Sequence, residues 1–149
     1  MKNLILAAAI FASTGAYASA GCPNFVGKFQ LQDSTQPVVL NATQVGCTSV
    51  ELDYTEPNGE ILGKVYPLDN VRRQTYQDAT MIMYETSGMN GNALQNLVEE
   101  FYIATNETIT AVSQFYLDAN NNLIATDQYY DQNGKLYHSE SNQYNRVQQ

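Results

Sequence analysis

Two acidic residues, Glu99 and Asp127, fall within segments where apolar and polar residues alternate as they do along β-strands. Two carboxylates on one sheet face could cleave a glycosidic bond, because glycosidase carboxyl groups lie about 5–9 Å apart. Two strand spacings of about 4.8 Å would permit such a separation. A small β-domain, however, offers little cleft for a polysaccharide chain. Carboxylates on an apolar face must be hydrogen-bonded, hydrated or in contact with a ligand, so a structural role and a binding role both stay open.

Other catalytic and metal-binding patterns are missing from the sequence. His138 is the only histidine, which excludes a metal site made of several histidines. No G-x-S-x-G elbow is present, and neither cysteine has the C-x-x-C spacing of a redox or zinc site. The sequence therefore predicts a protein that is not an enzyme, has no catalytic residues and needs neither a metal nor another cofactor.

The composition is that of a small acidic domain. The chain has 149 residues, with 15 Asp and Glu against 7 Lys and Arg and a formal charge of −8. Binding to nucleic acid requires clustered basic side chains, so this charge argues against a nucleic-acid partner. Hydrophobic residues make up 44 % and charged residues 15 %, a balance that predicts a folded domain rather than a disordered tail.

The N-terminus has the pattern of a secretory signal peptide. Lys2 precedes an apolar stretch at residues 4–12 that is too short to span a membrane. Two cleavage patterns of small residues follow, ending at positions 18 and 20. We expect residues 1–20 to be a signal peptide and residues 21–149 to form one domain in the periplasm or outside the cell, with no transmembrane segment.

Cys22 and Cys47 are the only cysteines, and an oxidising compartment would join them in a disulfide. The closed loop of about 25 residues would stabilise the fold by roughly 3 kcal/mol in the chain-entropy model. An alternative is a lipid anchor on Cys22, because residues 19–22 resemble the end of a bacterial lipoprotein signal, with Ser19 in place of the usual Leu. The sequence favours the disulfide.

Alternating residues from position 24 onward predict an all-β domain. Asn, Gly, Asp and Pro interrupt the pattern at intervals of roughly ten residues. We expect antiparallel strands at residues 24–32, 36–44, 48–56, 60–67, 73–86, 96–104, 108–118, 122–131 and 135–144. At residues 89–101 a helical stripe overlaps with a strand pattern, which predicts a short helical turn that leads into a strand.

One type of turn is used repeatedly. An acidic residue precedes a three-residue loop that ends in Gly or Asn, the residues that adopt the left-handed backbone of a type I turn with a G1 bulge. The loops are residues 57–59, 119–121 and 132–134. The residues that flank each loop should pair: Glu56 with Glu60, Asp118 with Asn122, and Asp131 with Lys135.

Strand pairing counted from these turns places polar residues in a row on the apolar face. Ser113 should oppose Asp127, and Asp127 should oppose Ser139. Tyr129 should oppose Tyr137, and both should point inward. If Ile103 opposes Ile109, Glu99 joins the end of the row. We expect a ligand-binding site made of Glu99, Ser113, Asp127, Ser139, Tyr129 and Tyr137, and the alternative is a hydrated interior without a ligand.

Two short patches resemble the lipocalin and calycin family. Residues 24–29, Asn-Phe-Val-Gly-Lys-Phe, are similar to the family's opening Asn/Asp-Phe-x-Gly-x-Trp, with Phe29 in the position of Trp. Arg146 is similar to the arginine that the family packs over that ring. The resemblance implies an up-and-down meander that closes into a calycin-like barrel of about 8–9 strands, with Phe29 and Arg146 as a structural stack. The chain has no Trp, and no long helix is expected after the last strand, so it looks like a shorter relative, the class that includes exported inhibitors of proteases and of lysozyme.

These observations predict an exported, non-enzymatic binding protein that holds a small amphiphilic molecule in a β-barrel. The alternative is a protein-binding or enzyme-inhibitor domain that acts through its loops and its outward-facing tyrosines Tyr102, Tyr116 and Tyr130. An internal cavity would favour the first function, and a filled core with an exposed apolar patch would favour the second.

Overall fold

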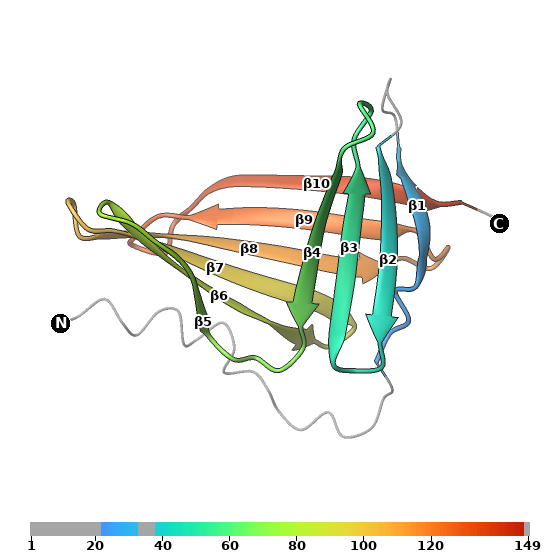
Figure 1. Ribbon diagram of the computed structural model, residues 1–149, viewed down its shortest axis with the longest axis horizontal. Coiled ribbons are helices and arrows are strands. Elements are labelled where there is room, and N and C mark those ends of the chain that lie inside the picture. The colour runs from blue at the N-terminus through green and yellow to red at the C-terminus, as the bar shows by residue number, and fades with distance from the viewer. Residues whose placement is uncertain (1–21, 33–37, 148–149) are drawn as a thin grey trace.

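The computed structural model describes residues 22–32 and 38–147, which form antiparallel strands (Figure 1). The strands are β1 (Gly27–Leu31), β2 (Val39–Val45), β3 (Ser49–Thr55), β4 (Ile61–Pro67), β5 (Arg73–Gln77), β6 (Met81–Asn90), β7 (Ala93–Tyr102), β8 (Glu107–Leu117), β9 (Leu123–Tyr130) and β10 (Leu136–Arg146). No helix that could cross a membrane occurs in this part of the chain. The predicted signal peptide at residues 1–20 lies outside the described residues, as does the start of the strand predicted at 36–44.

The strands belong to one sheet with the order β4-β3-β2-β1-β10-β9-β8-β7-β6-β5. Neighbours in the sheet are also neighbours in the sequence except at the centre, where β1 pairs with β10. The sheet curls so that β1 to β4 cross over one end of β6 to β10, while the other ends of β6 to β10 extend beyond the crossing (Figure 1). The all-β antiparallel meander is thus confirmed.

The sheet is not closed, so the predicted barrel closure is not confirmed. β4 and β5 are the two edges of the sheet. The chain that connects them bonds to β6: the Asn70 amide donates to the Ser87 carbonyl at 2.9 Å, and the Ser87 hydroxyl donates to the Pro67 carbonyl at 2.6 Å. These bonds hold the end of β4 against the middle of β6, which leaves β5 on the outer side of β6.

The strand prediction needs correction in two places. The segment at residues 73–86 holds two strands, because the Asp78 carboxylate accepts hydrogen bonds from the amides of Thr80 and Met81 at 2.7 and 2.8 Å and reverses the chain. Residues 89–101 contain no helical turn, since the chain reverses at Gly91 with a φ of 60° and continues directly as β7. Apolar residues are buried on both faces of β7, and for this reason their spacing resembles the apolar stripe of a helix.

The repeated turns form as predicted. The Asp118 amide donates to the Asn122 carbonyl at 2.9 Å, and the same bond joins Glu56 to Glu60 at 2.8 Å and Asp131 to Lys135 at 3.0 Å. The third loop residue has a positive φ in each turn: 86° at Gly59, 61° at Asn121 and 74° at Gly134. The loop chemistry therefore fixes how each of these hairpins begins.

The predicted register between β7 and β8 is wrong. The left-handed residue of this turn is Asn106, with a φ of 54°, and the hairpin closes with Tyr102 opposite Glu107. Ile103 therefore lies in the turn and does not oppose Ile109. As a result Ser113 pairs with Asn96 on β7, and Glu99 falls on the other face of the sheet.

The predicted register between β9 and β10 is also wrong, although their turn is right. A β-bulge lies between Leu136 and His138, so Tyr137 is an extra residue without a cross-strand partner. Beyond the bulge every pair is shifted by one position. Asp127 therefore pairs with Glu140 rather than with Ser139, and Tyr129 pairs with His138 rather than with Tyr137.

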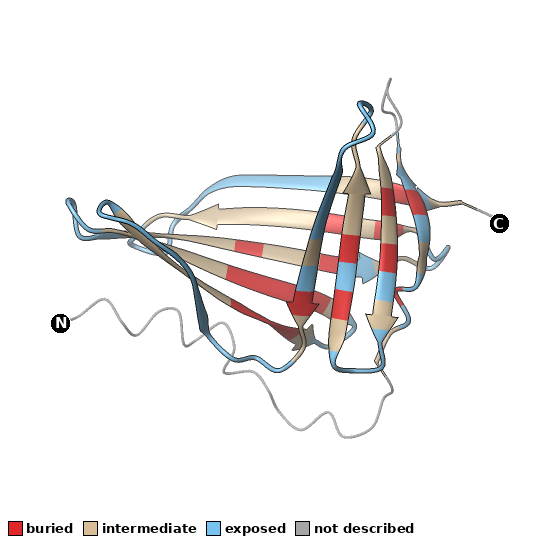
Figure 2. Cartoon of the chain, viewed as in Figure 1, coloured by how far each residue is buried: buried red, intermediate tan, exposed pale blue. Residues whose placement is uncertain are grey.

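The core fills the space between the crossing strands (Figure 2). It is made by the face of the sheet that curls inward, which we call the concave face. The largest fully buried apolar side chains are Phe25, Phe29, Leu40, Leu52, Leu94 and Leu123. Farther along β6 to β10, where nothing crosses the strands, fewer residues are buried (Figure 2).

Arg146 at the end of β10 packs over Phe29 of β1, as predicted, with its guanidinium carbon 4.7 Å from the ring centroid. Its Nη1 donates to the Val26 carbonyl at 3.0 Å, and its Nε donates to the Asn121 carbonyl at 3.1 Å. Gly27 makes room for this side chain, because a Cβ there would lie 2.6 Å from Nη1. The stack therefore ties the two ends of the domain together.

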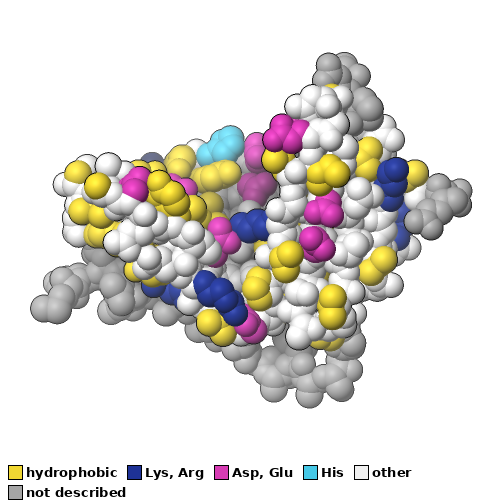
Figure 3. Space-filling view, viewed as in Figure 1, with side chains coloured by type: hydrophobic (Ala, Val, Ile, Leu, Met, Phe, Trp, Pro, Cys, Tyr) yellow, Lys and Arg dark blue, Asp and Glu magenta, His cyan; other side chains and the backbone are white. Residues whose placement is uncertain are grey.

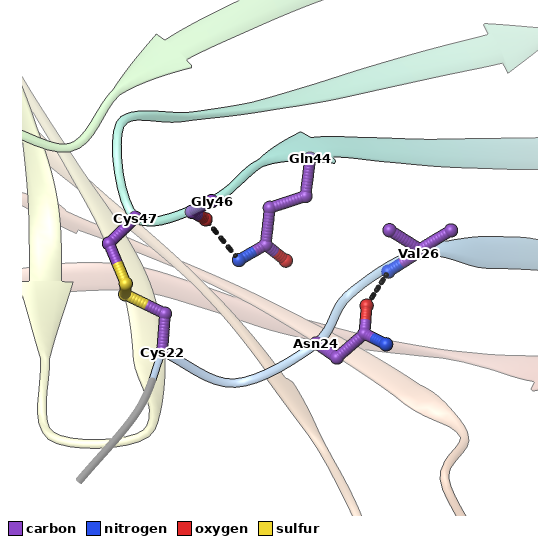
Figure 4. Close-up of a pocket in the computed structure, with 6 residues that line it drawn as sticks. All are labelled: Cys22, Asn24, Val26, Gln44, Gly46 and Cys47. Atoms are coloured by element: carbon purple, nitrogen blue, oxygen red, sulfur yellow. Dashed lines mark hydrogen bonds between the residues drawn. A yellow bond between two sulfur atoms is a disulfide. The ribbon is translucent and has the colours of Figure 1, made fainter.

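The predicted disulfide between Cys22 and Cys47 is present. It links the segment before β1 to the turn between β2 and β3. A pocket of about 270 Å³ lies beside it (Figure 4). The Gln44 side chain in this pocket accepts a hydrogen bond from the Phe25 amide at 2.9 Å and donates one to the Gly46 carbonyl at 2.7 Å. The amide oxygen and nitrogen of Gln44 thus both have partners within the protein.

Candidate binding site

A row of polar residues crosses β6 to β10 on the concave face. Cross-strand pairing places its members side by side, and they are Ser87, Asn96, Ser113, Asp127 and Glu140. We call this set the polar row. The next row toward the core is apolar on four of these strands, with Met89, Leu94, Phe115 and Ala125. The polar row therefore marks the boundary between the filled core and the open half of the concave face.

Ser113 and Asp127 are joined by a hydrogen bond from the serine hydroxyl to the carboxylate. These two residues were predicted to lie side by side, and the structure brings them together. Ser87 uses its hydroxyl to hold the carbonyl of Pro67. Each of these three side chains thus has a partner within the protein.

Asn96 is the exception in the polar row. The residue is only 3 % exposed, and its side-chain carbonyl Oδ1 is buried without a hydrogen-bond partner. A buried polar atom left without a partner costs about 1–3 kcal/mol. Most buried polar groups are satisfied, so an orphaned acceptor at this boundary marks a place where a donor is missing.

β4 lies opposite the polar row and brings a basic group toward it. The Lys64 ammonium lies 2.9 Å from the Glu85 carboxylate of β6, and it lies 5.2 Å from the centre of the Tyr66 ring. The side chains are 40 % and 21 % exposed, respectively, so this ion pair is open to water. In the space-filling view several acidic side chains and a basic one gather between the crossing strands and the extended ends of β6 to β10 (Figure 3).

Tyrosines line the boundary from both sides. Burial raises the pKa of Tyr54 well above its ordinary value, and nearby Tyr144, Tyr66 and Asp127 raise it further. Burial also raises the pKa of Tyr66, with added contributions from Glu85 and Asp127. These tyrosines therefore stay neutral and present rings and hydroxyl groups next to the carboxylates.

The other predicted site residues are divided between the two faces. Tyr129 lies on the concave face, opposite Ala111 and His138, and its ring centre is 6.3 Å from that of Tyr137 at the bulge. Ser139 is exposed and falls on the opposite face, where it pairs with Gln128. Tyr137 is 56 % exposed.

Glu99 also lies on the opposite face. Its carboxylate forms a 2.6 Å ion pair with the Nε of Arg72, whose guanidinium stacks on the Tyr84 ring at 3.5 Å. This arrangement gives Glu99 a structural partner away from Asp127. The two carboxylates therefore do not form the pair that glycoside cleavage would need.

Sequence reasoning missed Asn96, Glu140, Glu85 and Lys64. Asn96 carried a partial signal, because it and Gln95 are polar residues between the apolar Leu94 and Leu97. Glu140 carried none, because a β-bulge with Tyr137 leaves no clear mark in the sequence. Lys64 and Glu85 meet only because β4 crosses β6, a contact that pairing rules along the sheet do not give.

The arrangement suits binding through hydrogen bonds and charge. Its remaining hydrogen-bonding capacity is mainly that of acceptors: the Asn96 carbonyl has no partner, and the carboxylates of Asp127 and Glu140 can accept further bonds. Among the described residues no group of three or more His, Cys, Asp or Glu is arranged to hold a metal ion. Comparison with models of protein families and with curated proteins finds no match to this chain.

Proposed function

We propose that this chain is an exported, non-enzymatic binding protein that holds a small amphiphilic molecule on the concave face of its sheet. The orphaned Oδ1 of Asn96 carries the proposal, because it places an unmet acceptor where the apolar core ends. A ligand whose polar head meets the polar row and whose apolar part rests on the neighbouring core residues would satisfy both surfaces.

Several further features support export and a binding role. The apolar N-terminal stretch at residues 4–12 has the length of the apolar region of a signal peptide, and the disulfide suits an oxidising compartment. The stack of Arg146 on Phe29 is the contact that a calycin-like relative would have.

A fluorescent amphiphile tests the proposal. N-phenyl-1-naphthylamine, whose emission rises in apolar surroundings, should bind the protein saturably with one site per chain. The variant Asn96→Leu should weaken this binding at least tenfold, because it removes a hydrogen-bond acceptor from the site. Ser139→Ala, on the opposite face, is the matched control and should bind as the wild type does. Absence of saturable binding, or equal binding by both variants, would contradict the proposal.

A protein-binding or inhibitor role is the second candidate, and exposed apolar side chains favour it. Ile61, Leu62 and Val65 on the edge strand β4 are 63 %, 52 % and 56 % exposed. Exposed apolar groups on a sheet edge are typical of surfaces that meet another chain. Native mass spectrometry of freshly purified protein separates the two functions: a bound small molecule supports the first, and a bound protein supports the second.

A further inference from the structure

We infer that the head group of the amphiphile is an organic cation, and that the Lys64 ammonium occupies part of its place in the free protein. The inference rests on the proposed function and specifies its ligand class. It follows from the charges, the unmet acceptor and the rings that face one another across the open half of the concave face.

The charges on this face are unbalanced. Asp127 and Glu140 lie directly opposite each other, and Glu85 lies on the same face. Lys64 bonds to Glu85 alone. Arg73, which pairs with Glu85 along the sheet, directs its guanidinium to Asp69 at 2.9 Å. His138 lies 3.7 Å from Glu140 and is charged only when it is protonated. Asp127 therefore has a serine partner but no cation.

The groups on this face that can form further hydrogen bonds are acceptors, which also favours a cationic ligand. Oδ1 of Asn96 can only accept, as can the ionised carboxylates of Asp127 and Glu140. A head group that donates hydrogen bonds and carries positive charge suits such acceptors. An anionic head group would face repulsion from the carboxylates and would leave Asn96 without a donor.

The aromatic rings add a second means of holding a cation. The Lys64 ammonium already lies over the Tyr66 ring, and Tyr54 and Tyr144 lie nearby with ring centres 6.3 Å apart. Ring faces attract ammonium groups more strongly when water is excluded.

A ligand could displace the Lys64 ammonium from Glu85. It is anchored on an edge strand, its side chain is 40 % exposed, and its ion pair with Glu85 is screened by water. Exposed ion pairs of this kind contribute little to stability, so a ligand ammonium can replace one at low cost.

The test compares three amphiphiles with the same chain and different heads: octylamine, octanol and octanoate, at neutral pH, by isothermal titration calorimetry. Octylamine should bind about tenfold or more tightly than octanol, and octanoate should bind weakest. Lys64→Met should tighten octylamine binding several-fold, because the internal competitor is gone. Lys28→Met, which removes a lysine from β1 on the other face, should leave all three affinities unchanged.

Two acidic variants probe the preference for a cation. Asp127→Asn and Glu140→Gln should each reduce the ratio of octylamine to octanol affinity, and Glu140 is exposed enough that its variant folds even if the other does not. If all three amphiphiles bind equally, or octanoate binds best, the inference is wrong while the proposed function stands. If none of them binds, the proposed function fails as well.

Discussion

Asp127 on β9 lies directly opposite Glu140 on β10, so two carboxylates share one cross-strand position on the concave face. Like charges in such a position destabilise a sheet. The hydroxyl of Ser113 compensates Asp127 with a hydrogen bond, but Glu140 has only the side chain of His138 near it. This position therefore reduces the stability of the domain.

Glu140→Gln should make the free protein more stable. The change removes one of two opposed charges, which is worth roughly 0.2–1 kcal/mol for such a pair, toward the lower end at this exposed position. The urea unfolding midpoint at neutral pH and low salt measures the effect. Glu51→Gln, an exposed glutamate on β3, serves as the control and should change the midpoint less. A lower midpoint for Glu140→Gln would show that the pair is not repulsive.

Asn96→Leu should also stabilise the free protein, by about 1–2 kcal/mol. Leu has nearly the shape of Asn and removes the orphaned acceptor. Gln95→Leu is the matched control, because Gln95 is equally buried but its Oε1 accepts a hydrogen bond from Asn90 at 3.1 Å. Urea unfolding should show a gain for the first variant and none for the second. A loss of stability at position 96 would mean that its side chain is satisfied in solution.

Arg146→Ala should destabilise the domain by about 1–2 kcal/mol, since it removes a ring stack and two hydrogen bonds to carbonyl groups. Arg146→Lys keeps the charge but not the planar fork, so it should recover only part of this loss. Thermal unfolding measures both. Gly27→Ala should be destabilising for a related reason, because its Cβ would meet the guanidinium. Equal stability of the Ala and Lys variants would show that charge has no part in the contact.

Asn121→Ala should cost about 1 kcal/mol, and Asn121→Gly should cost less or nothing. The residue has a φ of 61°, a left-handed conformation that alanine adopts with strain and glycine adopts freely. Asn120→Ala, at the preceding loop position, is the control. The denaturant midpoints of the three variants give the comparison. If the Ala and Gly variants at position 121 are equally stable, the turn does not require this conformation.

The stability of the domain should fall as pH rises above about 10. Burial raises the pKa of Tyr54, Tyr66 and Tyr144 above the ordinary value of 10.0. The unfolded chain therefore releases these protons at a lower pH than the folded one, and stability decreases from pH 10 upward until the folded groups ionise.

Urea midpoints measured between about pH 8 and pH 11 test this expectation. The double variant Tyr54→Phe with Tyr66→Phe should show a flatter decline than the wild type. Tyr116→Phe, which removes a tyrosine that is 37 % exposed, is the control. A decline of equal slope in the double variant and the wild type would contradict the assignment.

The sequence predicted those parts of the fold that depend on local chemistry. The turns at Gly59, Asn121 and Gly134 need a left-handed residue, and their sequences supply one. The pairing of Ser113 with Asp127 followed directly from the second of these turns. The contact between Phe29 and Arg146 was implied by the resemblance of two short patches to a family.

The parts that failed depend on longer-range geometry. Closure of the sheet would require β4 to meet β5, but hydrogen bonds of Asn70 and Ser87 direct the chain against β6. Because of the bulge at Tyr137, Glu140 lies on the concave face where Ser139 was predicted. The turn before β8 has Asn106 as its left-handed residue, a position that the prediction did not use, and Glu99 therefore lies on the other face. The two register errors each shifted a strand by an odd number of positions, and because side chains alternate between faces, this moved the predicted residues to the other face.

The pairing of β1 with β10 has a consequence for how the chain must fold. The two strands in the middle of the sheet are the first and the last to be synthesised, and the apolar face of each half is covered only by the other half. Contacts between residues so distant in sequence form late and slowly. Until residues 136–146 are made, the two halves can meet only where β4 lies against β6, so part of their apolar surface stays accessible until the final strand arrives.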